Sequence, residues 1–163
     1  MTAGVPFTIT RGVPPTWPGI GEAGRVVARF LATVRQSGDP HEAAQVMAPR
    51  VSAHQVTSHG PSVIVRTPEE YAAHVQEHLR MFGRFTFEVT EVFESGDRVY
   101  VRWHLRGHHL RTSAGEPGSG LPLSDVASAV YRVSEGRVAE YWIQADAHGL
   151  LQQLDRLEST TDR

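Results

Sequence analysis

Three titratable side chains in the C-terminal half of the chain could carry out proton transfer. Asp146 directly follows a predicted strand, Arg137–Ala145, Glu140 lies within that strand, and His104 lies within an earlier one. Partial burial raises the pKa of a carboxyl group and makes it a better base near neutral pH, and an imidazole titrates close to neutral pH. Asp146, His104 and Glu140 are therefore the predicted catalytic residues, with Asp146 as the general base.

The residues around Asp146 alternate in a way that predicts a cavity. In a strand, Glu140, Trp142, Gln144 and Asp146 share one face, and the other face is mostly apolar. A file of Glu, Trp, Gln and Asp is unusual beneath covering helices unless it borders a pocket. Asp146 also stands where it could cap a final helix, so a purely structural role is the alternative.

A second predicted strand, Arg98–His109, has one apolar face and one polar face. The polar face carries Arg102 and His104 and is expected to meet solvent, a partner subunit or the pocket. Arg102 could stabilise an enolate or a carboxylate, although an ion pair with a neighbouring Glu is the more common role of such a side chain. The predicted substrate-binding residues are His54, Tyr71, Arg102, Trp142, Gln144 and Phe82.

Composition excludes several kinds of chemistry. The chain of 163 residues has no Cys and no Lys, which removes thiolate nucleophiles, disulfides and Schiff-base catalysis by lysine. His74 and His78 are spaced i, i+4 and could present two imidazoles to zinc, but without further ligands we expect no metal. A net charge of −2 offers no electrostatic attraction to nucleic acid or an anionic membrane. With neither a long apolar span nor a secretory signal, the chain is expected to be cytoplasmic.

The remaining pattern predicts an α+β domain over residues 20–158, preceded by an extended, proline-rich arm (1–19) and followed by a short tail (159–163). Apolar residues at helical spacing follow Ile20, Asp39-Pro40 opens a short helix through His41–Ala48, and a strand is expected at Val51–Val56. A capping box, Thr67-Pro68-Glu69-Glu70, opens a helix that stops at Gly83. The predicted later elements are the strands Arg84–Glu94, Arg98–His109, Pro122–Ser134 and Arg137–Ala145, and a helix at Ala147–Leu157. Long antiparallel strands curl, and helices on the concave side would close a small-molecule pocket.

Several segments resemble one known family. The run Gly96-Asp97-Arg98-Val99-Tyr100-Val101-Arg102-Trp103 is similar to a hairpin of the SnoaL-like polyketide cyclases. The segment Glu135–Trp142, followed by Asp146 and Leu150-Leu151-Gln152-Gln153-Leu154, is similar to the family's C-terminal motif. Met47-Ala48-Pro49-Arg50-Val51 and His54 are similar to its early segment. The resemblance covers roughly residues 24–154. Two departures are the loop Leu110–Gly120, which often borders the pocket mouth in the family, and Asp155 in place of a glycine.

The resemblance implies a cone-shaped α+β barrel of the nuclear transport factor 2-like class, usually a homodimer. It also implies a cofactor-independent cyclase of natural-product biosynthesis, with Asp146 as the base in an intramolecular ring closure. Related folds open epoxides or only bind small ligands, so an epoxide-opening cyclase or hydrolase and a non-catalytic binding module are the alternatives.

Overall fold

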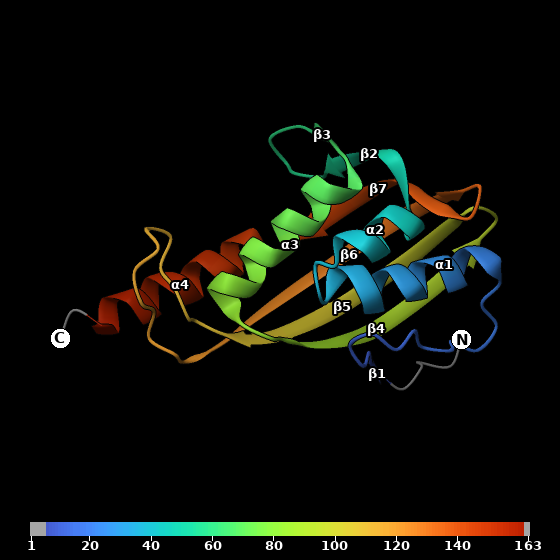
Figure 1. Ribbon diagram of the computed structural model, residues 1–163. Helices are drawn as coiled ribbons and strands as arrows, with labels where there is room; N and C mark the ends of the chain where they lie inside the picture. Colours follow the sequence, from blue (N-terminus) through green and yellow to red (C-terminus); the bar gives the residue numbers. More distant parts are fainter. Residues whose placement is uncertain (1–5, 162–163) are drawn as a thin grey trace.

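The computed structural model describes residues 6–161, in which helices cover one face of a seven-stranded sheet (Figure 1). The helical elements are α1 (Glu22–Phe30), a π-helical turn η1 (Leu31–Arg35), α2 (Pro40–Val46), α3 (Pro68–Phe82) and α4 (Ala147–Thr161). The strands are β1 (Phe7–Thr8), β2 (Met47–Gln55), β3 (Ser62–Arg66), β4 (Thr86–Ser95), β5 (Arg98–His108), β6 (Pro122–Ser134) and β7 (Arg137–Ala145). None of the helices within residues 6–161 has the length and apolar character needed to cross a membrane.

The sheet runs in the order β1-β4-β5-β6-β7-β2-β3. Neighbouring strands are antiparallel except for β2 and β7, which pair in parallel, with His54 opposite Trp142. The sheet curves around the helices without closing on itself (Figure 1). The predicted cone-shaped α+β fold is confirmed, with an open edge at β1 and another at β3.

The helix starts follow from local capping. Thr67 accepts a hydrogen bond from the Glu70 N–H, and the Glu70 carboxylate accepts one from the Thr67 N–H, so the predicted capping box is present. Asp39 caps α2. That helix ends at Val46 rather than at Ala48, because Met47 already pairs with Val138 as the first residue of β2.

The N-terminus of α1 is capped from the sheet. Gly21, at the N-cap position, has no side chain to accept hydrogen bonds. The Glu94 carboxylate on β4 accepts them instead, from the N–H of Gly21 at 3.1 Å and from the N–H of Gly24 at 2.6 Å. This contact ties the first helix to the sheet and satisfies two donors that would otherwise lack partners.

The described part of the proline-rich arm, residues 6–19, packs on the body of the domain. Phe7 and Thr8 pair with β4, and Ile9 and Trp17 are 3% and 4% exposed. The side-chain amide of buried Gln36 donates to the Ile9 carbonyl at 3.2 Å. The arm therefore completes the hydrophobic core under α1 and η1.

Candidate functional site

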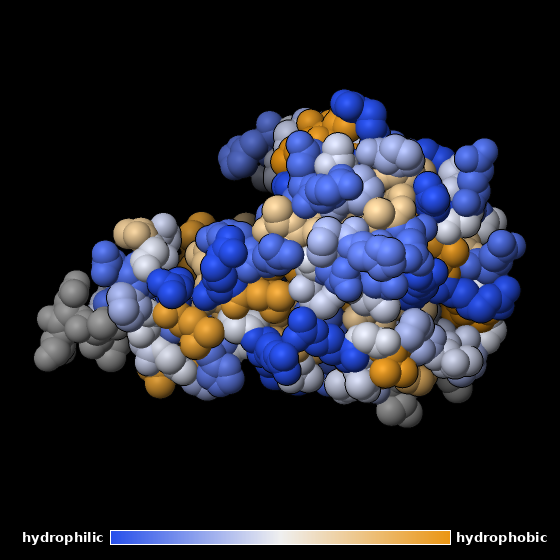
Figure 2. Space-filling model, in the orientation of Figure 1, coloured by the Kyte–Doolittle hydropathy of each residue, from blue (hydrophilic) through white to orange (hydrophobic). Residues whose placement is uncertain are grey.

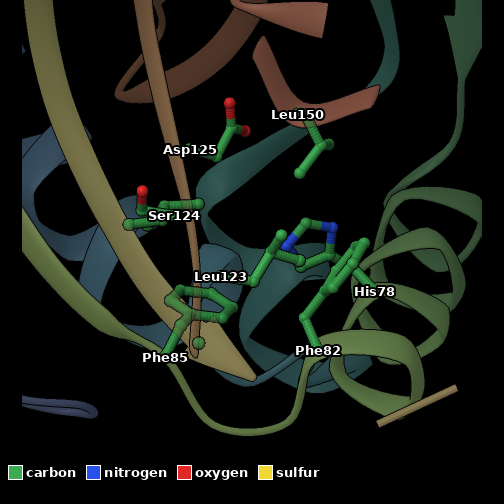
Figure 3. Close-up of a pocket in the computed structure, with 9 residues that line it drawn as sticks. His78, Phe82, Phe85, Leu123, Ser124, Asp125 and Leu150 are labelled. Carbon is green, nitrogen blue, oxygen red and sulfur yellow. The ribbon is translucent and has the colours of Figure 1, made fainter. Parts of the chain in front are cut away.

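A pocket opens between α3, α4 and the helix-covered face of the sheet. The space inside it, counted together with the solvent at its mouth, is about 280 Å³. In Figure 3, His78 from α3 lies between Asp125 and Leu150 at one end and Phe82 and Phe85 at the other. The lining residues are His78, Phe82, Phe85, Leu105, Gly107, Leu123, Ser124, Asp125 and Leu150. The predicted substrate-binding residue Phe82 is one of them.

Asp125 is the carboxylate that the structure places in this pocket. It lies opposite Leu105 in the β5–β6 ladder, in the same phase as the buried residues Leu123 and Ala127. Burial raises its pKa above the usual value of an aspartate; a hydrogen bond from the Val126 N–H and the charge of Arg35 oppose this, and the charge of Asp146 adds a smaller increase. A desolvated carboxylate of this kind is a stronger base than one in water.

His78 is a neutral imidazole in the same pocket. Its ring packs edge-on against Phe82 and Phe85, with centroid distances of 4.7 and 5.6 Å. Burial, assisted by the positive charge of Arg35, lowers the pKa of His78 to about 3. At neutral pH the ring therefore has one nitrogen that donates a hydrogen bond and one that accepts.

The glycine at position 107 permits this close packing. A Cβ there would lie 2.8 Å from the Phe82 carbonyl oxygen and 3.6 Å from the Phe85 Cβ. Gly107 therefore lets the end of α3 approach β5 closely enough for Phe82 and Phe85 to form the pocket floor.

Asp146, the predicted base, is exposed at the start of α4. Its Oδ1 accepts a hydrogen bond from the Gly149 N–H at 3.0 Å, and its own N–H donates to the Val126 carbonyl at 3.0 Å. Asp146 thus caps α4, as the alternative structural role predicted. It precedes the pocket residue Leu150 by one turn and is close enough to raise the pKa of Asp125. Within residues 6–161, its Oδ2 accepts no hydrogen bond.

Glu140, Trp142 and Gln144 lie on the outer face of the sheet, opposite the helices. The Glu140 carboxylate contacts His54 Nε2 at 2.7 Å and accepts a hydrogen bond from Arg132 Nε at 2.8 Å. Trp142 stacks on His54 with a centroid distance of 4.9 Å. Contrary to the prediction, these three residues do not border the pocket in the structure, because the helices cover the opposite face of β7, which carries Tyr141.

Arg102 and His104 share the same outer face. Arg102 pairs with Glu91 across the β4–β5 ladder. His104 Nδ1 is 3.3 Å from the Arg106 guanidinium. Their neighbours in β5, Val101 and Trp103, are buried under the helices. The structure therefore brings none of His54, Arg102, His104, Glu140, Trp142 and Gln144 into the pocket.

Tyr71 lies on the inner side, as part of an aromatic cluster. Its ring packs on Phe30 at 5.3 Å and on Tyr141 at 6.3 Å. Tyr131 contacts both Phe30 and Tyr141. Tyr71 is 6% exposed, and burial raises the pKa of its hydroxyl.

The sequence reasoning missed Asp125. The signal was available, since Leu123, Ala127 and Ala129 alternate as apolar residues and Asp125 interrupts their phase. A single acid among buried positions of a strand is a stronger indication of a site than an acid at a strand end. In the part of the chain that the structure describes, no three His, Asp or Glu side chains gather in a way that could hold a metal ion.

Comparisons with known proteins agree with this architecture. The model of the SnoaL-like polyketide cyclase family matches residues 25–154. IdmH from Streptomyces antibioticus, proposed to be a polyketide cyclase, is 26% identical over 83% of this chain and 99% of its own, with a TM-score of 0.68. A proposed polyketide cyclase from Acidithiobacillus ferrooxidans is 20% identical over 86% of this chain and 99% of its own, with a TM-score of 0.74.

No curated protein sequence matches this chain significantly. The family model nevertheless spans most of the chain, and it covers every residue that lines the pocket. The cone-shaped fold is the one that the resemblance implied. The chain belongs to the SnoaL-like polyketide cyclase family.

Proposed function

We propose that the protein is a cofactor-independent cyclase that closes a ring by acid–base catalysis in the pocket between α3 and α4. One observation carries the proposal: Asp125 places a desolvated carboxylate in an apolar pocket that also contains the neutral imidazole of His78. The family and the 26% identical IdmH support a polyketide cyclase-type activity. The reaction and its residues rest on the geometry of the pocket.

The proposed reaction is an intramolecular aldol closure. Asp125 removes a proton from a carbon next to a carbonyl group, and the enolate carbon attacks a second carbonyl carbon of the same molecule. One carbon–carbon bond forms, and the alkoxide takes the proton back from Asp125 directly or through His78. The apolar walls hold the two carbons together, which can contribute on the order of 7–11 kcal/mol at best.

The predicted base Asp146 has a place in this proposal. At the start of α4, its negative charge helps keep Asp125 a strong base. Its unbonded Oδ2 could also act on a substrate that reaches the edge of the pocket. Substitution separates the two roles: D125N removes the base inside the pocket, and D146N removes the charge outside it.

Turnover of a synthetic linear poly-β-ketone ester, with products analysed by NMR, tests the proposal. Loss of a general base lowers the rate by about 10²–10⁴-fold. We expect that loss for D125N, a smaller loss for D146N, and no change for D155N, which removes an exposed carboxylate from the middle of α4. A D125N enzyme that keeps full turnover would overturn the assignment of Asp125. If only D146N is inactive, Asp146 is the base.

Epoxide opening is the second candidate, and the nearness of two carboxylates favours it. With its raised pKa, Asp125 can protonate an epoxide oxygen while the Asp146 side chain activates a hydroxyl group or water. Product structure separates the two reactions. A new carbon–carbon bond supports the aldol reaction, and a cyclic ether or a diol supports epoxide opening.

We also propose that the chain forms a homodimer through the outer face of the sheet. A row of side chains crosses six adjacent strands on this face, each opposite the next in the ladder. The members of this outer row are Val63, His54, Trp142, Val130, Tyr100 and Phe93. Val63 and Phe93 at its ends are 54% and 51% exposed. Apolar residues are also exposed around β3 on the helix-covered side of the molecule, which is the side that Figure 2 shows.

Analytical ultracentrifugation tests the dimer. F93E puts a charge at an exposed end of the outer row and should shift the protein to monomers. V13E, at an exposed position in the arm, should leave the dimer intact. A wild-type protein that sediments as a monomer at micromolar concentration would contradict this proposal.

A further inference from the structure

Two half-buried arginines, Arg35 and Arg66, lack the ion-pair partners that a partly buried cation normally has. Arg35 ends the π-helical turn η1, and Arg66 ends β3; both are only partly exposed. Within residues 6–161, neither guanidinium takes part in an ion pair or a hydrogen bond with another residue. Arg35 lies over the Phe85 ring at 5.6 Å, and the Arg66 Nε is buried without an acceptor. A buried guanidinium nitrogen normally has an acceptor, so the Arg66 Nε favours an anion as a binding partner.

The two cations act on a common set of side chains. Both lower the pKa of Tyr71, His74 and Tyr141, against the larger effect of burial on the two tyrosines. The charge of Arg35 also has a lowering effect on the pKa values of Tyr131, His78 and Asp125. Arg35 also packs against Phe85, a residue of the pocket lining, so its charge acts on both the aromatic cluster and the pocket. No carboxylate contributes to the pKa shifts of the three tyrosines, which leaves this part of the interior positively charged.

The tyrosines supply hydrogen-bond donors to the same region. The hydroxyl groups of Tyr71, Tyr131 and Tyr141 form no hydrogen bond with any residue that the structure describes. Burial raises the pKa of each, so all three keep their protons. Protonated hydroxyls that feel the charge of two guanidinium groups supply donors that can bind an oxygen anion.

We propose that Arg35 and Arg66, with the hydroxyls of the tyrosine cluster, bind an anionic oxygen group of the substrate, a carboxylate or an ionised enol. This proposal rests on the pocket being the substrate site, and it names the class of substrate. A molecule held by its anion at the cluster would extend past Phe85 toward His78 and Asp125. The arginines would hold one end of the substrate, and so determine which of its carbon atoms form the ring.

Benzoate and the uncharged benzamide are matched probes, because they differ mainly in charge. Titration followed by NMR should show that the wild-type protein binds benzoate at least about tenfold more tightly than benzamide, which corresponds to about 1.4 kcal/mol. R35Q and R66Q should each reduce this preference, and the double variant should abolish it. R35K, which retains the charge, should keep part of it. R137Q, at an exposed position at the start of β7, is the matched control and should keep all of it.

Equal affinity of the wild-type protein for the two probes, or no binding of benzoate at millimolar concentration, overturns the proposal. So does a benzoate preference that survives in the R35Q/R66Q variant. Thermal melts confirm that each variant is folded, and we expect only a small loss of stability for R35Q, which loses the contact of Arg35 with the Phe85 ring. D125N should keep the benzoate preference, because Asp125 is not part of the anion site. Binding of benzoate therefore tests the anion site, turnover of D125N tests the catalytic assignment, and the two proposals can fail independently.

Discussion

The Nε2 of His54 on β2 lies 2.7 Å from the Glu140 carboxylate on β7, across the parallel pair of strands. Glu140 also accepts a hydrogen bond from Arg132, and Trp142 stacks on the His54 imidazole. These contacts hold together the parallel seam of the sheet, at the point where β2 joins the antiparallel strands. Glu140 therefore contributes to the stability of the sheet by linking β2 to β7.

Replacement of Glu140 by Gln should destabilise the protein in a pH-dependent way. The hydrogen bond from Arg132, assisted by that from His54, lowers the pKa of Glu140. Its stabilising contribution is complete above the ordinary glutamate pKa and is lost as the pH falls through the lowered value. We expect E140Q to cost about 1 kcal/mol at pH 7 and nothing at the acidic end. Urea unfolding at several pH values measures this difference; a constant difference would count against the pairing.

His78 should make the protein sensitive to mild acid. Its pKa is about 3 in the folded chain and near 6.5 when unfolded. Between these values the unfolded state binds the extra proton, so stability falls as the pH falls, by up to about 1.4 kcal/mol per pH unit. H78N should show a shallower decline over the same range. Equal slopes for H78N and the wild-type protein would show that His78 is not desolvated.

Removal of the carboxylate that caps α1 should weaken the contact between helix and sheet. E94A leaves the N–H groups of Gly21 and Gly24 without their acceptor. We expect a loss of about 0.5–2 kcal/mol, the usual effect of removing a helix cap. Chemical denaturation gives the value. E91A, which removes an exposed ion pair with Arg102, should cost less.

The arm should behave as part of the core. Trp17 is 4% exposed, and replacing a buried aromatic residue with Ala costs about 3–5 kcal/mol. W17F should cost much less, because the indole nitrogen of Trp17 has no hydrogen-bond partner within residues 6–161. V13A, at an exposed position in the same arm, is the control. A W17A protein as stable as V13A would show that the arm is detached in solution.

The strands of the antiparallel part of the sheet were predictable because their signals are local. The expected ranges Pro122–Ser134 and Arg137–Ala145 agree with β6 and β7, and Arg98–His109 differs from β5 by one residue. Turns such as Gly96-Asp97 and Glu135-Gly136 set these limits through neighbouring residues alone. The capping box at Thr67 is equally local.

The inner face of β7 could not be predicted from alternation alone. A strand has two faces, and the pattern does not say which one the helices cover. Tyr141 lies inside because Tyr71 and Tyr131 pack around its ring, whereas Trp142 lies outside on His54. Both outcomes depend on residues far away in the chain. The same is true of Arg35, whose position depends on the π-helical turn at the end of the first helix.

The parallel pairing of β2 with β7 has a consequence for the order of events during synthesis. β2 leaves the ribosome early with only β3 beside it, and the neighbour that anchors it to the rest of the sheet is the last strand to be made. The segment β4–β5–β6 can pair as it emerges, but β2 must wait until Ala145 has been translated. Nascent chains shorter than this leave one edge of β2 unpaired, and we expect this to be the stage most prone to aggregation.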